Sequence, residues 1–166
     1  MYHKINDFLS EWEYESNSTI QVFKNITDEV LLKKDFENIR SISILCWHIT
    51  ITLSEMMNRA GLSVIGPDEH SIPPDHIEEI IRVYQESAKS VSEQVATKWR
   101  DEILTEEVDM YGENWKKGVV LSILIRHQAH HRGQLTILMR QAGLKVPGVY
   151  GPSREEWLGM NLTAPE

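Results

Sequence analysis

The stretch IRHQAHHRGQL, which runs from Ile125 to Leu135, lies in the middle of a strong helix pattern near the end of the chain. Within it, His127 and His131 are four residues apart and therefore fall on one face of a helix, one turn apart. Apolar residues continue that face in both directions, as in a helix that packs against a core: Val120, Leu124, Leu135 and Leu138. Two imidazoles thus occupy positions where the pattern favours aliphatic side chains.

This histidine pair needs a bonding partner if its face is buried, because burying an unpaired imidazole costs free energy. A divalent metal ion is one such partner, and histidines at i and i+4 can bind the same ion. Pairs with this spacing also arise by chance on helix surfaces and in cores. The pair alone therefore leaves both a metal site and a structural role open.

His48 is the best candidate for a third ligand, since catalytic zinc sites usually combine three protein ligands with an open fourth position. It lies in a second helical pattern whose middle, residues 42–53, is apolar on nearly every side. If the two helices face each other, the three imidazoles can converge. Gln128 stands where a zincin has its glutamate, and an amide cannot act as a general base, so a metalloprotease of that class is excluded.

The remaining histidines and the cysteine are weaker candidates. The side chain of His130 points roughly 100° away from that of His131 around the helix. Cys46 lies on a nearly opposite side of its helix from His48, and a lone cysteine in an apolar helix is most often a core residue. Three further histidines lie near the N-terminus or around a proline-rich loop and are predicted to be exposed: His3, His70 and His76.

Four long helical patterns predict an all-α fold, and no repeat or long linker divides residues 1–166. They cover about residues 5–26, 36–60, 75–95 and 117–141. Gly61 and Gly143 are placed to end the second and fourth helices. Residues 63–74, with three prolines, form a loop, and residues 99–116 are ambiguous, with a small hairpin around Gly112 as one reading. We therefore predict a single four-helix-bundle domain with long loops after its second and third helices.

Composition excludes several function classes. The 166 residues carry a formal net charge of −8 and form no long basic run, which argues against binding to nucleic acid or to an anionic membrane surface. No apolar run is long enough to span a bilayer, and the N-terminus lacks the pattern of a signal peptide. With one cysteine, a cytoplasmic location is expected.

Two motifs carry a resemblance to a known family: HQAHHRGQL at residues 127–135, followed by LMRQAGLKVP at 138–147, and LCWHI at 45–49. In them the chain resembles the DinB/YfiT-like superfamily, which includes thiol-dependent S-transferases and related metal-dependent enzymes. The resemblance implies an up-down-down-up four-helix bundle and a divalent metal held by His48, His127 and His131. It also implies a homodimer. An unrelated DNA polymerase shares the name DinB, and nothing in this acidic chain suggests polymerase chemistry.

The function implied is a metal-dependent S-transferase or hydrolase. The ion would be Zn2+, Ni2+ or Fe2+, and it would activate a low-molecular-weight thiol or water against a small electrophilic substrate. The alternative is a stress-associated metal-binding or structural bundle without turnover. A third reading is a bundle whose histidines bond to one another or to carboxylates. Neither the metal nor the substrate follows from the sequence, since three imidazoles accept several ions and fold does not fix function.

The surroundings of the site are less defined by the sequence. Glu55, further along the His48 helix, is a candidate to orient that histidine. Arg132 and Gln134 point away from His131 and are interpreted as packing or dimer contacts, and Trp47 as a core residue. We expect loop 61–75, connection 99–116 and the tail around Tyr150 to border an open cleft at the end of the bundle.

Overall fold

The structure, a computed structural model, describes residues 1–33 and 40–165. It is mostly helical with one small sheet, so the prediction of a helical fold is confirmed in its main part. In the part of the chain described, no helix combines the length and the apolar character needed to cross a membrane. The elements, in chain order, are α1 (Ile5–Phe23), α2 (Asp28–Leu31), α3 (Ile42–Arg59), α4 (Ile77–Lys98), the 3-10 helix η1 (Asp101–Thr105), β1 (Glu107–Met110), β2 (Glu113–Lys116), α5 (Lys117–Gln141) and α6 (Arg154–Gly159).

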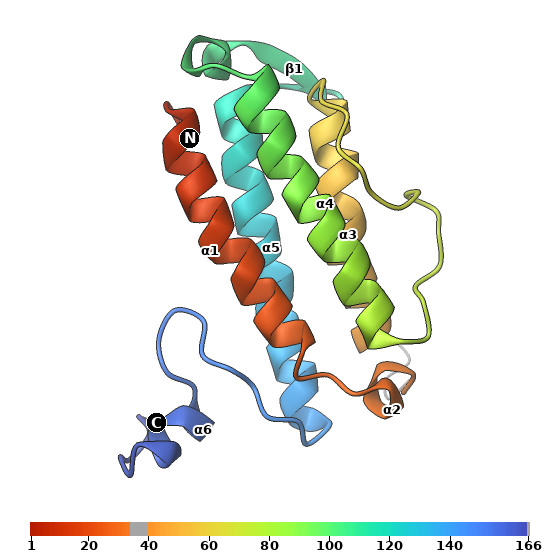
Figure 1. Cartoon of the computed structure of the whole chain (residues 1–166), viewed down its shortest axis with the longest axis vertical. Helices are drawn as coiled ribbons and strands as arrows, with labels where there is room; N and C mark the ends of the chain where they lie inside the picture. Colours follow the sequence, from red (N-terminus) through yellow and green to blue (C-terminus); the bar gives the residue numbers. More distant parts are fainter. Residues whose placement is uncertain (34–39, 166) are drawn as a thin grey trace.

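The four long helices, α1, α3, α4 and α5, lie side by side, and Figure 1 shows the direction in which each one runs. α1 and α5 run one way, and α3 and α4 run the other way. α3 and α4 are therefore parallel, and the segment between them returns along the full length of the helices. α1 packs against α4 and α5, and α3 packs against the same two helices, so α3 and α5 are direct neighbours.

The connection before α5 contains the hairpin that the sequence left ambiguous. β1 pairs with β2 in antiparallel register, from Glu107 opposite Lys116 to Met110 opposite Glu113, around a two-residue turn at Tyr111 and Gly112. Met110 is fully buried and closes this end of the core, whereas most of the hairpin is exposed.

Two predicted helix ends are confirmed. Gly61, at φ 93°, follows α3, and Gly143, at φ 80°, follows α5. Both glycines allow the left-handed conformation that closes a helix with backbone hydrogen bonds back to its last turn. The predicted start of the second helix, at residue 36, lies outside the described residues, and helix is described from Ile42 onward.

The core lies between the four long helices and is apolar, with large side chains from each helix. Phe8 and Trp12 of α1 are fully buried and stacked, and the Trp12 indole N–H donates to the carbonyl oxygen of Ala88 in α4. Cys46 and Trp47 are buried in α3, as predicted.

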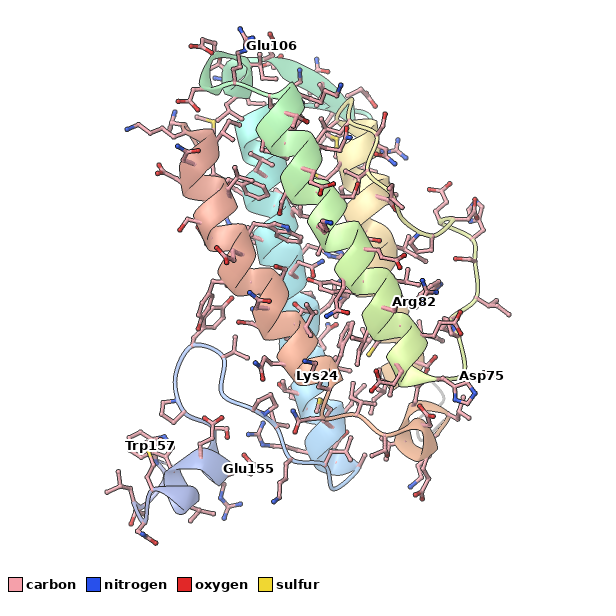
Figure 2. The ribbon with its side chains drawn as sticks, viewed as in Figure 1. Lys24, Asp75, Arg82, Glu106, Glu155 and Trp157 are labelled. Carbon is pink, nitrogen blue, oxygen red and sulfur yellow. The ribbon has the colours of Figure 1, made fainter. Side chains whose placement is uncertain are left out.

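The C-terminal segment leaves the end of α5 and returns beside α1. The Tyr14 hydroxyl donates to the carbonyl oxygen of Val149, and the Arg140 guanidinium lies 3.3 Å from the Glu155 carboxylate. Figure 2 shows Glu155 and Trp157 on α6, set apart from the long helices. This segment therefore makes contacts with both α1 and α5.

Candidate metal centre

Three histidines meet where α3 faces α5. Nε2 of His48 lies 3.1 Å from Nε2 of His127 and 3.2 Å from Nε2 of His131. One nitrogen from each ring lies within 4.8 Å of the other two. The convergence that the sequence predicted from a histidine pair on one helix and a single histidine on another is present.

The spacing of these nitrogens fits one ion. Zinc–nitrogen bonds of about 2.0–2.1 Å in tetrahedral geometry place neighbouring nitrogens roughly 3.3 Å apart. The observed 3.1 and 3.2 Å require only small shifts of the rings to reach that spacing. Hydrogen bonds among the rings explain the cluster less well. A ring nitrogen has either one proton or one lone pair, so Nε2 of His48 cannot make a full hydrogen bond to both partners.

The protonation of the three rings also suits a metal. Burial, with help from the Arg40 charge and from His131, lowers the pKa of His48 to about 4. Burial and the neighbouring histidines lower the pKa of His127 to about 3, and burial lowers the pKa of His131 as well. All three rings are therefore neutral near pH 7, which is the form that binds metal ions.

Gln134 orients one of the ligand candidates. Its Oε1 lies 2.8 Å from Nδ1 of His131, and its Nε2 lies 3.1 Å from Nε2 of His130. When Nδ1 of His131 donates to Gln134, Nε2 is left with its lone pair directed at the cluster. The expectation that Gln134 points away from His131 is therefore wrong, and a dimer contact at this exposed residue stays a prediction. His130 is exposed and lies outside the three-histidine group, as predicted.

Thr52 lies beside the second ligand candidate of α5. Its hydroxyl oxygen is 3.5 Å from Nδ1 of His127, and the hydroxyl also lies 3.0 Å from the carbonyl oxygen of His48. This is a longer contact than that of Gln134, so the orientation of the His127 ring is less firmly fixed. Thr52 was not predicted from the sequence, although it lies one helical turn beyond His48 on α3.

Gln128 points away from the histidines and into the core. It is fully buried, its Oε1 accepts from the Tyr84 hydroxyl at 3.0 Å, and its Nε2 donates to the carbonyl oxygen of Ile49 at 3.1 Å. This amide therefore joins α5 to α4 and to α3. A zincin has its glutamate base at this position of the motif. Gln128 faces away from the histidines, which agrees with the exclusion of that class of enzyme.

Arg132 is buried against α1. Its guanidinium lies 2.5 Å from a carboxylate oxygen of Glu15, and both side chains are 3% exposed. The Tyr150 hydroxyl accepts from Arg132 and donates to Glu15, at 2.7 Å each. The interpretation of Arg132 as a packing residue fits this arrangement. Glu15 was not predicted from the sequence, although it lies three residues after Trp12 and is buried with it on α1.

Glu55 does not orient His48. Its carboxylate accepts from the Tyr111 hydroxyl at 2.8 Å and from Nε of Arg59 at 3.2 Å. It therefore links the end of α3 to the hairpin. The predicted role of Glu55 in orienting His48 is not supported by these contacts.

A pocket of about 510 Å³ adjoins His131. It lies between the start of α3 and the last turns of α5, and Tyr150 and the 61–75 and 99–116 segments do not line it. We expected a cleft bordered by the 61–75 loop and the 99–116 connection. The pocket lies elsewhere, because His48 is nearer to the first turns of α3 than to its last turns.

The other three histidines are exposed, as predicted: His3, His70 and His76.

Comparison with known proteins agrees with this fold. The chain is 34% identical over all 166 residues to the uncharacterised protein YrdA of Bacillus subtilis (strain 168), covering 99% of it. The crystal structure of a DinB-like protein from Bacillus cereus is 35% identical, with a TM-score of 0.85 over 90% of this chain and 100% of that chain. The DinB-like protein YjoA of Bacillus subtilis has the same fold at 20% identity, with a TM-score of 0.68 over 86% of this chain and 96% of that chain. The model of the DinB family matches residues 1–163, and the chain therefore belongs to the DinB family.

Proposed function

We propose that this chain is a divalent-metal-dependent enzyme of the thiol S-transferase or hydrolase type, with His48, His127 and His131 as the metal ligands. The observation that carries the proposal is the convergence of three Nε2 atoms from two neighbouring helices. The proposal includes a DinB/YfiT-like four-helix bundle as one domain, in which the ion joins α3 to α5. A homodimer in the cytoplasm stays a prediction from the sequence.

The residues around the site have separate tasks. The three imidazoles hold the ion, and Gln134 keeps the proton of His131 on Nδ1. His48 and His127 are only partly buried, which leaves a side of the cluster accessible to a small molecule. A divalent ion bound there would lower the pKa of a coordinated water or thiol and so supply a nucleophile. Cys46 is fully buried, and burial raises the pKa of its thiol, so this thiol is not the nucleophile.

The partners proposed are a small electrophilic substrate and, for the transferase reaction, a low-molecular-weight thiol. Three neutral imidazoles suit Zn2+, Ni2+ and Fe2+ alike, so the ion depends on availability as well as on the ligands. Coordination number separates an enzyme from a structural site, because a catalytic ion keeps a position for the reacting molecule.

The first test is metal content. Untagged wild-type protein, His131→Ala and the neighbouring control His130→Ala are analysed by plasma mass spectrometry. We expect about one equivalent of a divalent metal in the wild type and the control, with loss in His131→Ala. Protein that stays metal-free after incubation with zinc, nickel and iron salts would overturn the proposal.

The second test separates an enzyme from a metal-binding protein without turnover. Metal-loaded wild type is assayed for thiol transfer and for hydrolysis against a panel of small electrophiles, with His48→Ala as the metal-site control. Turnover that requires the metal supports the enzyme. A full equivalent of tightly bound metal without turnover in any assay favours a metal-binding role.

A further inference from the structure

The pocket beside His131 has the size and lining of a site for a small organic molecule. Its volume of about 510 Å³ falls within the range of roughly 300–1,000 Å³ that is typical of ligand sites. It combines an apolar wall, two amide side chains and one guanidinium with a ring of the histidine cluster. The lining residues are Arg40, Leu45, His131, Gln134, Ile137, Leu138 and Gln141.

Arg40 provides the positive charge among these lining residues. It lies two residues before the start of α3, on the rim that faces the last turns of α5. It lines the same pocket as His131, so its charge lies near one ring of the histidine cluster. The chain as a whole carries a net charge of −8 and repels anions. The Arg40 guanidinium therefore gives the pocket a local preference for anions, although the net charge of the molecule repels them.

We propose that Arg40 binds the carboxylate of a small organic acid whose aliphatic part lies against Leu45 and Leu138 and whose other end reaches His131. The inference rests on the proposed function and names the substrate class for that site. A guanidinium forms two parallel hydrogen bonds with a carboxylate. Among the described lining residues, one positive charge balances a carboxylate monoanion, whereas a phosphate dianion would keep an unbalanced charge.

The apolar wall sets the second requirement on the ligand. Leu45 is buried in α3 and Leu138 is partly buried, while Ile137 is 60% exposed at the rim. An aliphatic chain placed against them would bury part of this surface, which stabilises binding. Gln134 lines the same pocket and bonds to the ring of His131. A ligand held at Arg40 would thus extend along the wall toward the proposed metal.

The test compares pentanoate with pentanamide, which share shape and chain length and differ in charge. Both are titrated into metal-free protein and followed by 1H–15N NMR shifts, so that the result is independent of metal binding. We expect pentanoate to bind about tenfold more tightly than the amide, from a hydrogen-bonded charge pair. Arg40→Gln should remove this preference. Arg100→Gln, an exposed residue outside the lining of this pocket, changes the net charge equally and should retain it.

A second pair of ligands connects the pocket to the metal. In zinc-loaded protein, 3-mercaptopropionate and 3-mercaptopropanamide are compared by calorimetry, and the acid should again bind about tenfold more tightly in wild type and equally in Arg40→Gln. Equal binding of acid and amide in the wild type, a preference that survives in Arg40→Gln, or no binding of either pentanoate or pentanamide would overturn the assignment. Absence of bound metal together with an Arg40-dependent preference for pentanoate would instead reject the proposed function and leave only a carboxylate-binding pocket.

Discussion

Gln134 connects two histidines of α5 and leaves the ring of His131 with its lone pair toward the cluster. Replacing such a partner of a metal ligand typically weakens metal binding by about 10- to 100-fold. We therefore expect Gln134→Leu to lower zinc affinity by that factor, measured in competition with a chromogenic chelator. Because Gln134 is exposed, the free energy of unfolding should change by less than about 0.5 kcal/mol. Gln141→Leu, also exposed and also beside the pocket, is the matched control, and equal affinities in both variants would contradict this role.

Gln128 lies on the buried side of α5, and replacing it tests the hydrogen bonds there. Gln128→Leu removes the acceptor of the Tyr84 hydroxyl and the donor to the Ile49 carbonyl. A buried polar group without its partner costs about 1–3 kcal/mol, so urea unfolding should show a loss of that size. The double variant Gln128→Leu/Tyr84→Phe removes both members of the pair and should be less destabilised than the sum of the two single variants. Strict additivity would mean that this hydrogen bond contributes nothing to stability.

At the scale of elements, the ion pair of Glu15 and Arg132 joins α1 to α5 inside the molecule. Removing one charge leaves the other buried and unpaired, which costs about 3–5 kcal/mol. Arg132→Met should therefore lose stability of that order in urea unfolding. Glu15→Met/Arg132→Met, which removes both charges, should be clearly more stable than Arg132→Met alone. The prediction fails when the double variant is the less stable of the two.

The short helix α2 is tied to the start of α4 by an exposed pair, Asp28 and His76, at 2.9 Å. The hydrogen bond to His76 lowers the pKa of Asp28, and the Asp28 carboxylate raises the pKa of His76. The raised pKa of His76 gives stability that is present below about pH 6.5 and is lost as pH rises through the folded value. The lowered pKa of Asp28 gives stability that is present above about pH 3.9 and is lost as pH falls through its folded value.

The contribution of this pair is therefore greatest between about pH 4 and pH 6.5. We expect the melting temperature of wild type to exceed that of His76→Gln most near pH 5, with the difference shrinking at pH 8 and at pH 3. His3→Gln, at an exposed histidine that forms no ion pair among the described residues, is the control and should show no such dependence. A difference that grows from pH 5 to pH 8 has the opposite sign and would rule out this linkage.

The elements that the sequence predicted well are those with long apolar periodicity. The boundaries of α5 agree with the predicted 117–141, because 25 residues of pattern end at a glycine that closes the helix. α1 ends three residues before the predicted residue 26, since the chain turns at Lys24 toward α2. α2 and η1, with four and five residues, are too short to show a period. Local pattern therefore indicated the long helices and not their short connections.

For the whole molecule, the histidine cluster was predictable and most of its surroundings were not. Burial of polar imidazoles on apolar faces is a local signal, visible at His48, His127 and His131. Contacts such as Tyr150 with Glu15, which are 135 residues apart, depend on how the ends of the chain meet. The same holds for Glu55 with Tyr111, because only the packed hairpin brings that hydroxyl to the end of α3. Side chains with ordinary local patterns thus acquired their roles from the tertiary structure.

Metal binding at this place should stabilise the whole molecule, because the ligands come from two helices that meet only in the folded chain. An ion that binds the folded state alone stabilises it by about 4 kcal/mol at a free concentration near 1,000 times Kd. Zinc should therefore raise the melting temperature of metal-free wild type, and a chelator should reverse the increase. His48→Ala, which removes the α3 ligand, should lose most of the shift, and His3→Ala, an exposed histidine, should keep it. A zinc-dependent shift of equal size in His48→Ala would place the stabilising ion elsewhere on the chain.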